Sequence, residues 1–140
     1  MGKDKELINS NIKKNTVLAI IIKKYKISNR FDVTSVDEIL QASVLSIKKN
    51  NVVQAHKHNL VRRETFGTQE VWIVKKGRGI VSFYDLNDEF LCSKKIVKGD
   101  MVLNFRGGHG LRPLSRKMVF IEIKNGPYKG SEIDKVSING

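Results

Sequence analysis

The chain has 140 residues, of which 40% are hydrophobic and 29% are charged, and its formal net charge is +12. This composition excludes a largely disordered chain and predicts one soluble globular domain. The charge comes mostly from lysine pairs spread along the chain, at 13–14, 48–49 and 94–95 among others, so a nucleic-acid partner is not favoured. A non-catalytic regulatory or nucleic-acid-binding β module nevertheless stays open as an alternative.

The N-terminal part of the chain changes character at residue 16. Residues 1–15 are polar and basic, and we expect a flexible N-terminus there. Residues 16–24 are rich in β-branched side chains and contain the continuous apolar run Val17–Ile22, which predicts a buried strand. Because this strand precedes the rest of the sheet, we expect it to pair with a second copy and form a homodimer.

Two features bear on the cellular compartment. The apolar run Val17–Ile22 is far shorter than the roughly 20 residues that span a bilayer, and no signal-peptide cleavage site follows it. The single cysteine, Cys92, rules out an internal disulfide and fits a reduced thiol in the core. We therefore expect a cytoplasmic protein without a membrane partner.

The remaining sequence consists of short strand-like runs separated by turn residues, followed by a polar tail at 129–140. No run has convincing helical periodicity, and the turn signals recur about every eight to twelve residues, so the pattern predicts an all-β sandwich or barrel. The predicted strands cover residues 40–48, 52–58, 70–75, 80–84, 90–97, 101–105 and 117–124.

The three histidines of the chain lie in two places only. His56 and His58 are two residues apart, so on the predicted strand 52–58 they share a face. Glu70 opens the next strand, and His109 lies in the glycine-rich turn at 107–110. Imidazoles and a carboxylate suit a divalent transition metal, here Fe, Mn, Ni, Co or Zn, among which the ligand types do not choose.

These residues resemble the motifs of the cupin superfamily, whose members are small jelly-roll β-barrels. In the first motif, His-x-His is followed by Glu, six residues and Gly, as in His56, His58, Glu70 and Gly77. The second motif begins with Gly and reaches one histidine, here His109. The resemblance implies a single-domain cupin-type jelly-roll β-barrel over residues 16–128, with its motif core at 40–125 and an extra N-terminal strand. It also implies that His56, His58, Glu70 and His109 bind the metal.

The match is closest to a group of small cupins found among proteins of sugar and surface-polysaccharide metabolism. The resemblance therefore implies a small, sugar-derived ligand, such as a sugar acid or a nucleotide sugar. The shared runs are Thr-Gln-Glu-Val at 68–71, Phe-Tyr-Asp at 83–85, Gly-Gly-His-Gly at 107–110 and a closing Glu-Ile-Lys-Asn-Gly-Pro-Tyr at 122–128.

One departure from the cupin pattern affects the carboxylate ligand. Eleven residues separate His58 from Glu70, which is more than the general pattern has. Glu64 lies in this longer loop and competes with Glu70 for the role. We prefer Glu70, because it keeps the spacing to Gly77.

The reaction class stays open between several possibilities. The first is a metal-dependent cupin, of an isomerase, epimerase or oxygenase class. The second is a metal-independent nucleotide-sugar isomerase or epimerase that uses its histidines as acid and base. Arg62 and Arg63, in the long loop, could pair with an anionic ligand, and Arg106 and Arg112 flank His109 in the same way. Glu122, in the last strand, is a candidate acid/base if its face points inward.

Overall fold

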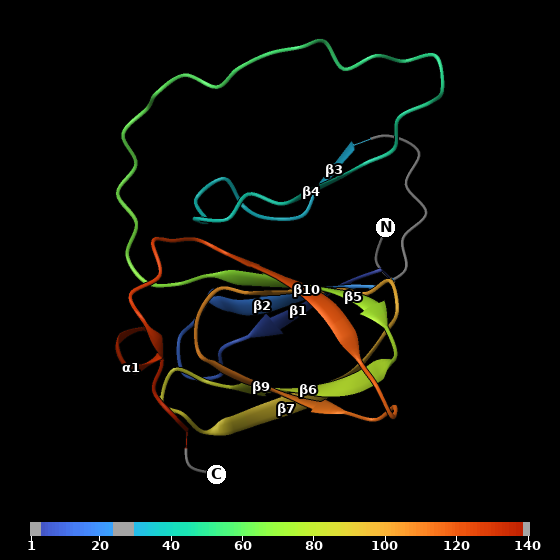
Figure 1. Ribbon diagram of the computed structural model, residues 1–140. Coiled ribbons are helices and arrows are strands. Elements are labelled where there is room, and N and C mark those ends of the chain that lie inside the picture. The colour runs from blue at the N-terminus through green and yellow to red at the C-terminus, as the bar shows by residue number, and fades with distance from the viewer. Residues whose placement is uncertain (1–3, 24–29, 139–140) are drawn as a thin grey trace. The chain divides into compact units, whose positions relative to one another are not determined.

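Antiparallel strands make up nearly all the regular structure of the computed structural model, which describes residues 4–23 and 30–138 (Figure 1). The all-β prediction is confirmed. The chain divides into two units, one formed by Met1–Tyr25 with Thr68–Gly140 and the other by Lys26–Gly67. The first, the sandwich unit, carries most of the strands. No helix in the described ranges is long and apolar enough to cross a membrane.

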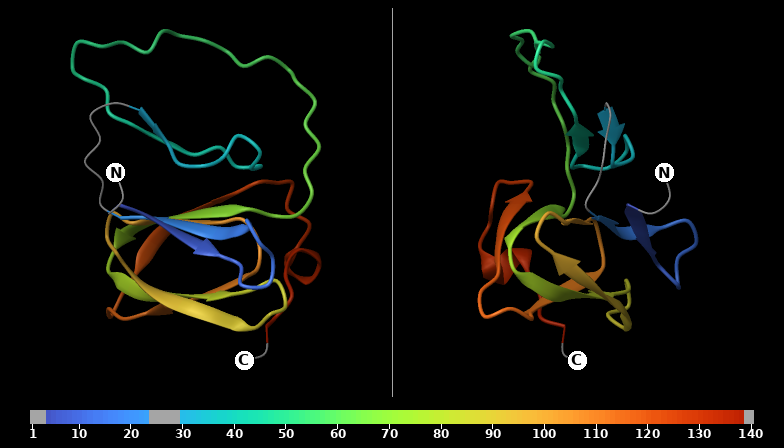
Figure 2. Two further views of the ribbon diagram at one scale, coloured as in Figure 1. Left: turned by 180° about the vertical axis from the view of Figure 1, so that it is seen from behind. Right: turned by 90° about the vertical axis from the view of Figure 1, so that its right-hand side faces the viewer.

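The sandwich unit contains two sheets that face each other (Figures 1 and 2). The larger sheet has the order β1-β2-β8-β5-β10 and the smaller one the order β7-β6-β9. The strands of the larger sheet are β1 (Lys5–Asn9), β2 (Val17–Ile22), β8 (Met101–Asn104), β5 (Glu70–Lys76) and β10 (Val119–Lys124). Those of the smaller sheet are β7 (Phe90–Val97), β6 (Arg78–Tyr84) and β9 (Gly108–Pro113), and the short helix α1 (Ser131–Asp134) follows.

The core lies between the two sheets, where buried apolar side chains from both sheets form one cluster. In β6, Val81 and Phe83 alternate with partly exposed residues, as expected of a strand with one buried face. Trp72 of β5 packs against the same cluster, and the free thiol of Cys92 borders it. Burial raises the pKa of Cys92, in keeping with a reduced thiol beside the core.

β2 confirms the predicted strand over Val17–Ile22, and residue 24 of the prediction lies outside the described residues. The place of β2 in the sheet corrects the reason for expecting a dimer. It pairs with β1 on one side and with β8 on the other, so it has no free edge for a second copy. Its run from Leu18 to Ile22 is buried on both faces, which explains the continuous apolar sequence. Within residues 1–15, where a flexible N-terminus is predicted, Lys5–Asn9 form β1 and pair with β2, and residues 1–3 lie outside the described residues.

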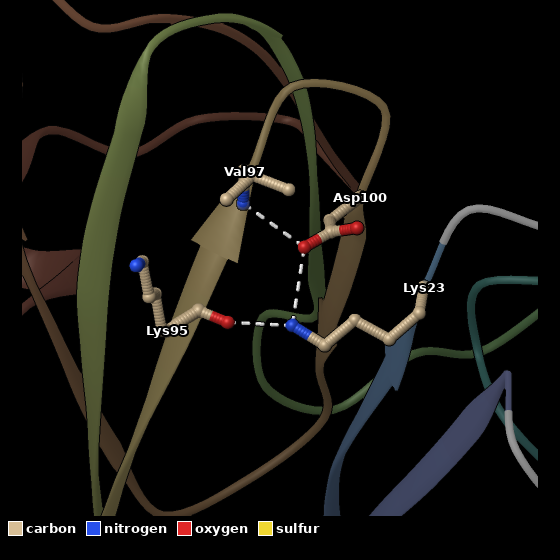
Figure 3. Close-up of a pocket in the computed structure, with 4 residues that line it drawn as sticks. All are labelled: Lys23, Lys95, Val97 and Asp100. Carbon is tan, nitrogen blue, oxygen red and sulfur yellow. Dashed lines mark hydrogen bonds and ion pairs between the residues drawn. The ribbon is translucent and has the colours of Figure 1, made fainter.

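A shallow hollow at one end of the sandwich unit is lined by Lys23, Lys95, Val97 and Asp100 (Figure 3). The Asp100 carboxylate accepts a hydrogen bond from the Val97 amide at 2.9 Å and an ion-paired one from Lys23 Nζ at 3.1 Å. Lys23 Nζ also donates to the Lys95 carbonyl at 2.5 Å. These bonds of Lys23 join the end of β2 to the β7–β8 turn and to β7.

Replacing Asp100 by alanine is expected to lower the free energy of unfolding by about 2–4 kcal/mol, since its side chain is only 1% exposed and both of its bonds are charge-assisted. The matched variant Lys23→Met should cost about 1 kcal/mol, because Lys23 is 33% exposed. Urea denaturation followed by circular dichroism measures both. Equal losses in the two variants would contradict a stabilising role for the hydrogen bond from the Val97 amide to the buried Asp100 carboxylate.

The second unit contains only a short hairpin. β3 (Arg30–Asp32) pairs with β4 (Ser43–Leu45), and the Val33 amide donates to the Ala42 carbonyl just beyond them. Arg30 Nε lies 2.7 Å from Asp32 Oδ1, and Ser43 donates to that same oxygen, which lowers the pKa of Asp32. The strand predicted at 40–48 is thus present but shorter.

The strand predicted at residues 52–58 is wrong. Residues 46–69 form no strand, and residues 51–68 are all exposed. A strand needs a neighbouring strand to pair its backbone groups, and none of the described strands pairs with residues 52–58. The apolar–polar alternation of Val52–His58 is therefore not sufficient to make a strand here.

Candidate functional site

The centre of the candidate site is a contact between Glu70 and His109. Glu70 Oε1 lies 2.5 Å from His109 Nε2, which joins the first residue of β5 in the larger sheet to β9 in the smaller one. Glu70 is 7% exposed, whereas the side chain of His109 is 29% exposed. The pair therefore lies at the rim of the core, with the carboxylate on the buried side and the imidazole toward solvent.

The sequence positions His109 through the local geometry of β9. Gly107 has φ of 71°, a left-handed conformation that glycine adopts without strain, and the chain then enters the strand directly. His109 and Leu111 project to the same side, and Leu111 packs against the core. The predicted glycine-rich turn is thus confined to its first residues, and His109 itself belongs to a strand.

Trp72 completes the environment of the imidazole. Its ring meets the His109 ring edge to face, with centroids 5.1 Å apart, and lies 5.4 Å from the Phe120 ring. Trp72 and Glu70 are two residues apart on β5 and so share the inner face. The carboxylate and the indole together fix the orientation of His109.

Opposing influences act on the pKa of Glu70. Burial raises it, but the hydrogen bond and electrostatic attraction from His109, together with the charges of Lys124 and Lys135, more than offset burial, so the pKa lies below its usual value. The carboxylate is therefore ionised at neutral pH and available as a hydrogen-bond acceptor or as a metal ligand.

Because the pKa of Glu70 is lowered in the folded state, the carboxylate stabilises the fold above its unfolded pKa, and this contribution is lost as the pH falls through the folded value. The stability difference between the wild type and Glu70→Gln should be constant near neutral pH and should shrink below about pH 4.5. Chemical denaturation at a series of pH values measures it. A difference that grows as the pH falls would contradict the assignment.

The remaining predicted metal ligands lie in the second unit. The rings of His56 and His58 are 5.4 Å apart at their centroids, and His56 Nδ1 lies 2.9 Å from the Gln54 carbonyl oxygen. Both side chains are exposed. The structure thus brings the predicted ligands together as two separate pairs, Glu70 with His109 and His56 with His58. Over the described ranges, no group of three or more His, Cys, Asp or Glu residues could hold a metal ion.

Four of the other charged candidates, Arg62, Glu64, Arg106 and Glu122, have ion-pair or backbone partners. Glu64, the competitor of Glu70, pairs with Arg62 at 2.7 Å, and both side chains are more than 80% exposed. Arg106 donates to the Val17 carbonyl at 2.5 Å, which ties it to β2. Glu122 faces the same side of β10 as the core residue Phe120, and its carboxylate lies 2.7 Å from Lys124 Nζ.

One polar side chain at the site is missed by sequence reasoning. Asn104, the last residue of β8, lies directly opposite Glu70 in the sheet. Its signal is a single amide within the apolar run Val102–Phe105.

A search of family models, a search of curated proteins and a search of solved structures each found no match to this chain.

Proposed function

We propose that this protein is a cupin-like β-sandwich that binds a small, anionic, sugar-derived molecule at the Glu70–His109 pair and uses the pair for proton transfer. The observation that carries the proposal is the 2.5 Å contact between a buried carboxylate and a partly exposed imidazole. Support for a cupin-type jelly roll comes from two facing antiparallel sheets and from the resemblance to the cupin motifs.

The chemistry of the pair follows from its geometry. A carboxylate next to an imidazole orients the ring, and an imidazole can take up a proton from a bound molecule and give it back. In an isomerase or epimerase, His109 would remove a proton from a carbon beside a carbonyl group, and the imidazolium would return it to the same or the neighbouring carbon. Lys124 and Lys135, whose positive charges both lower the pKa of Glu70, give the site positive charge for an anionic group.

A divalent metal ion is the second candidate, favoured by the close pair His56 and His58. The resemblance to cupins implies these two imidazoles, Glu70 and His109 as the ligands, and these are residue types that Fe, Mn, Ni, Co and Zn accept. Such an ion would supply a Lewis acid or a redox centre. In this version His109 and Glu70 would be ligands, and Glu122 or Arg62 would be left to handle protons and negative charge.

The two versions predict different results for two variants. Trp72 is the only tryptophan, so its emission reports on binding beside His109. For the acid–base version, we expect millimolar D-glucuronate to change this emission in the wild type and in His56→Ala/His58→Ala, but not in His109→Gln. For the metal version, elemental analysis should find one equivalent of metal, which the double variant loses. No response to glucuronate in the wild type, together with no metal, would contradict both versions.

A homodimer also stays a prediction, but we expect it to form through a strand other than β2. The free edges of the larger sheet are β1 and β10, and β10 carries the exposed apolar side chains Val119, Ile121 and Ile123. Light scattering over a range of protein concentrations tests this. A monomer at the highest concentration would contradict the prediction.

A further inference from the structure

A row of inward-facing side chains crosses the larger sheet beside the Glu70–His109 pair. Asn104 of β8 is opposite Ala19 on one side and Glu70 on the other, and Glu70 is opposite Lys124. Directly paired residues of antiparallel strands project to the same face. Because Glu70 reaches His109 of the facing sheet, this whole row, with Asn104 in it, points into the space between the sheets.

The amide of Asn104 has no partner in that space. Asn104 is 3% exposed, and neither its Nδ2 nor its Oδ1 has a hydrogen-bond partner within the described chain. Nε1 of Trp72 also has no hydrogen-bond partner within the described chain. Trp72 is 6% exposed and lies two residues after Glu70 on the inner face of β5. Buried polar groups without partners cost stability, and native proteins keep few of them. Two of them beside one carboxylate–imidazole pair therefore point to a bound polar molecule.

The donors and acceptors specify the chemistry of that molecule. Asn104 Nδ2 and Trp72 Nε1 can only donate, whereas Asn104 Oδ1 and the Glu70 carboxylate can only accept. A simple anion would meet two acceptors, and a cation would meet two donors, so neither satisfies the set. A hydroxyl group donates and accepts at once, and two neighbouring hydroxyl groups match all the groups available.

We propose that Asn104 and Trp72 form a subsite for adjacent hydroxyl groups of a polyol, next to the Glu70–His109 pair. The inference rests on the proposed function and narrows its ligand to a molecule with neighbouring hydroxyl groups. The residue opposite Asn104 in β2 is Ala19, whose side chain is small. The partly exposed side chain of His109 marks the side from which the ligand enters.

The test compares two probes of the same charge and ring size. D-glucuronate carries adjacent hydroxyl groups, and cyclohexanecarboxylate carries none. Titrations followed by Trp72 emission should show at least tenfold tighter binding of glucuronate to the wild-type protein. Equal affinity for the two probes would overturn the subsite and leave the anion site of the proposed function standing, whereas no binding of either probe would overturn both.

Variants at the subsite provide a second test. Asn104→Leu should raise the midpoint of thermal unfolding, because an apolar group of similar size replaces an amide without partners, and it should abolish the preference for glucuronate. The control Asn87→Leu, in the exposed β6–β7 turn, should leave the preference unchanged. Trp72→Phe keeps an aromatic ring but lacks the N–H, and calorimetry should show a weaker preference. A lower midpoint in Asn104→Leu, or an intact preference in it, would overturn the proposal.

Discussion

Truncating Phe83 to alanine is expected to lower the free energy of unfolding by about 3–5 kcal/mol. Phe83 is 1% exposed and belongs to the cluster between the two sheets, so the substitution leaves a cavity that rigid strands on both sides cannot close. Because Phe83 is paired with His109 across β6 and β9, the cavity should also loosen the imidazole. Urea denaturation measures the loss, and Trp72 emission reports on the site.

The control for Phe83 is a phenylalanine of the opposite environment. Phe66 is 100% exposed, so Phe66→Ala should change the free energy of unfolding by less than about 0.5 kcal/mol. Similar losses in the two variants would contradict the assignment of Phe83 to the core.

Replacing Gly107 by alanine is expected to lower the free energy of unfolding by about 2–4 kcal/mol. Gly107 has φ of 71°, and a Cβ there would lie 2.5 Å from the Tyr84 carbonyl oxygen, a backbone atom that cannot move aside cheaply. Relief of this clash would shift the start of β9, and with it His109. Glucuronate binding should therefore weaken together with stability.

Gly110 offers a matched control within the same strand. A Cβ on Gly110 meets nothing within 4 Å, so Gly110→Ala should be neutral or should stabilise the fold by up to about 1 kcal/mol. Thermal unfolding of the two variants side by side decides the matter. A loss of stability in Gly110→Ala as large as that in Gly107→Ala would show that the whole strand, and not the conformation of Gly107, resists side chains.

Strands with strong local signals could be predicted from the sequence. The run at 90–97 becomes β7 with the same bounds, and the runs at 70–75 and 117–124 become β5 and β10 with small shifts. In each case turn residues flank a stretch that contains several β-branched or aromatic side chains. The local pattern and the tertiary pairing therefore favour the same conformation in these strands.

Elements whose conformation depends on distant partners could not be predicted. β1 is a polar, charged strand whose signal is weak, and it exists because β2 offers it an edge. Residues 52–58 show the reverse, since their pattern is strand-like but no strand among the described residues pairs with them. A short segment of sequence does not show which distant strand will pair with it.

The same distinction applies to the candidate site. The residue types at positions 70 and 109 pointed to one site, and the structure brings them into contact. Asn104 escaped notice because its importance lies in the lack of a partner for its buried amide, which only the three-dimensional arrangement reveals.

The position of β2 between β1 and β8 has a consequence for synthesis on the ribosome. β1 can pair with β2 as soon as both have emerged, but the other edge of β2 must wait until residues 101–104 are made. During that interval a six-residue apolar strand has unpaired backbone groups along one side. Nascent chains stalled before residue 101 should therefore bind chaperones or aggregate, whereas full-length chains should not.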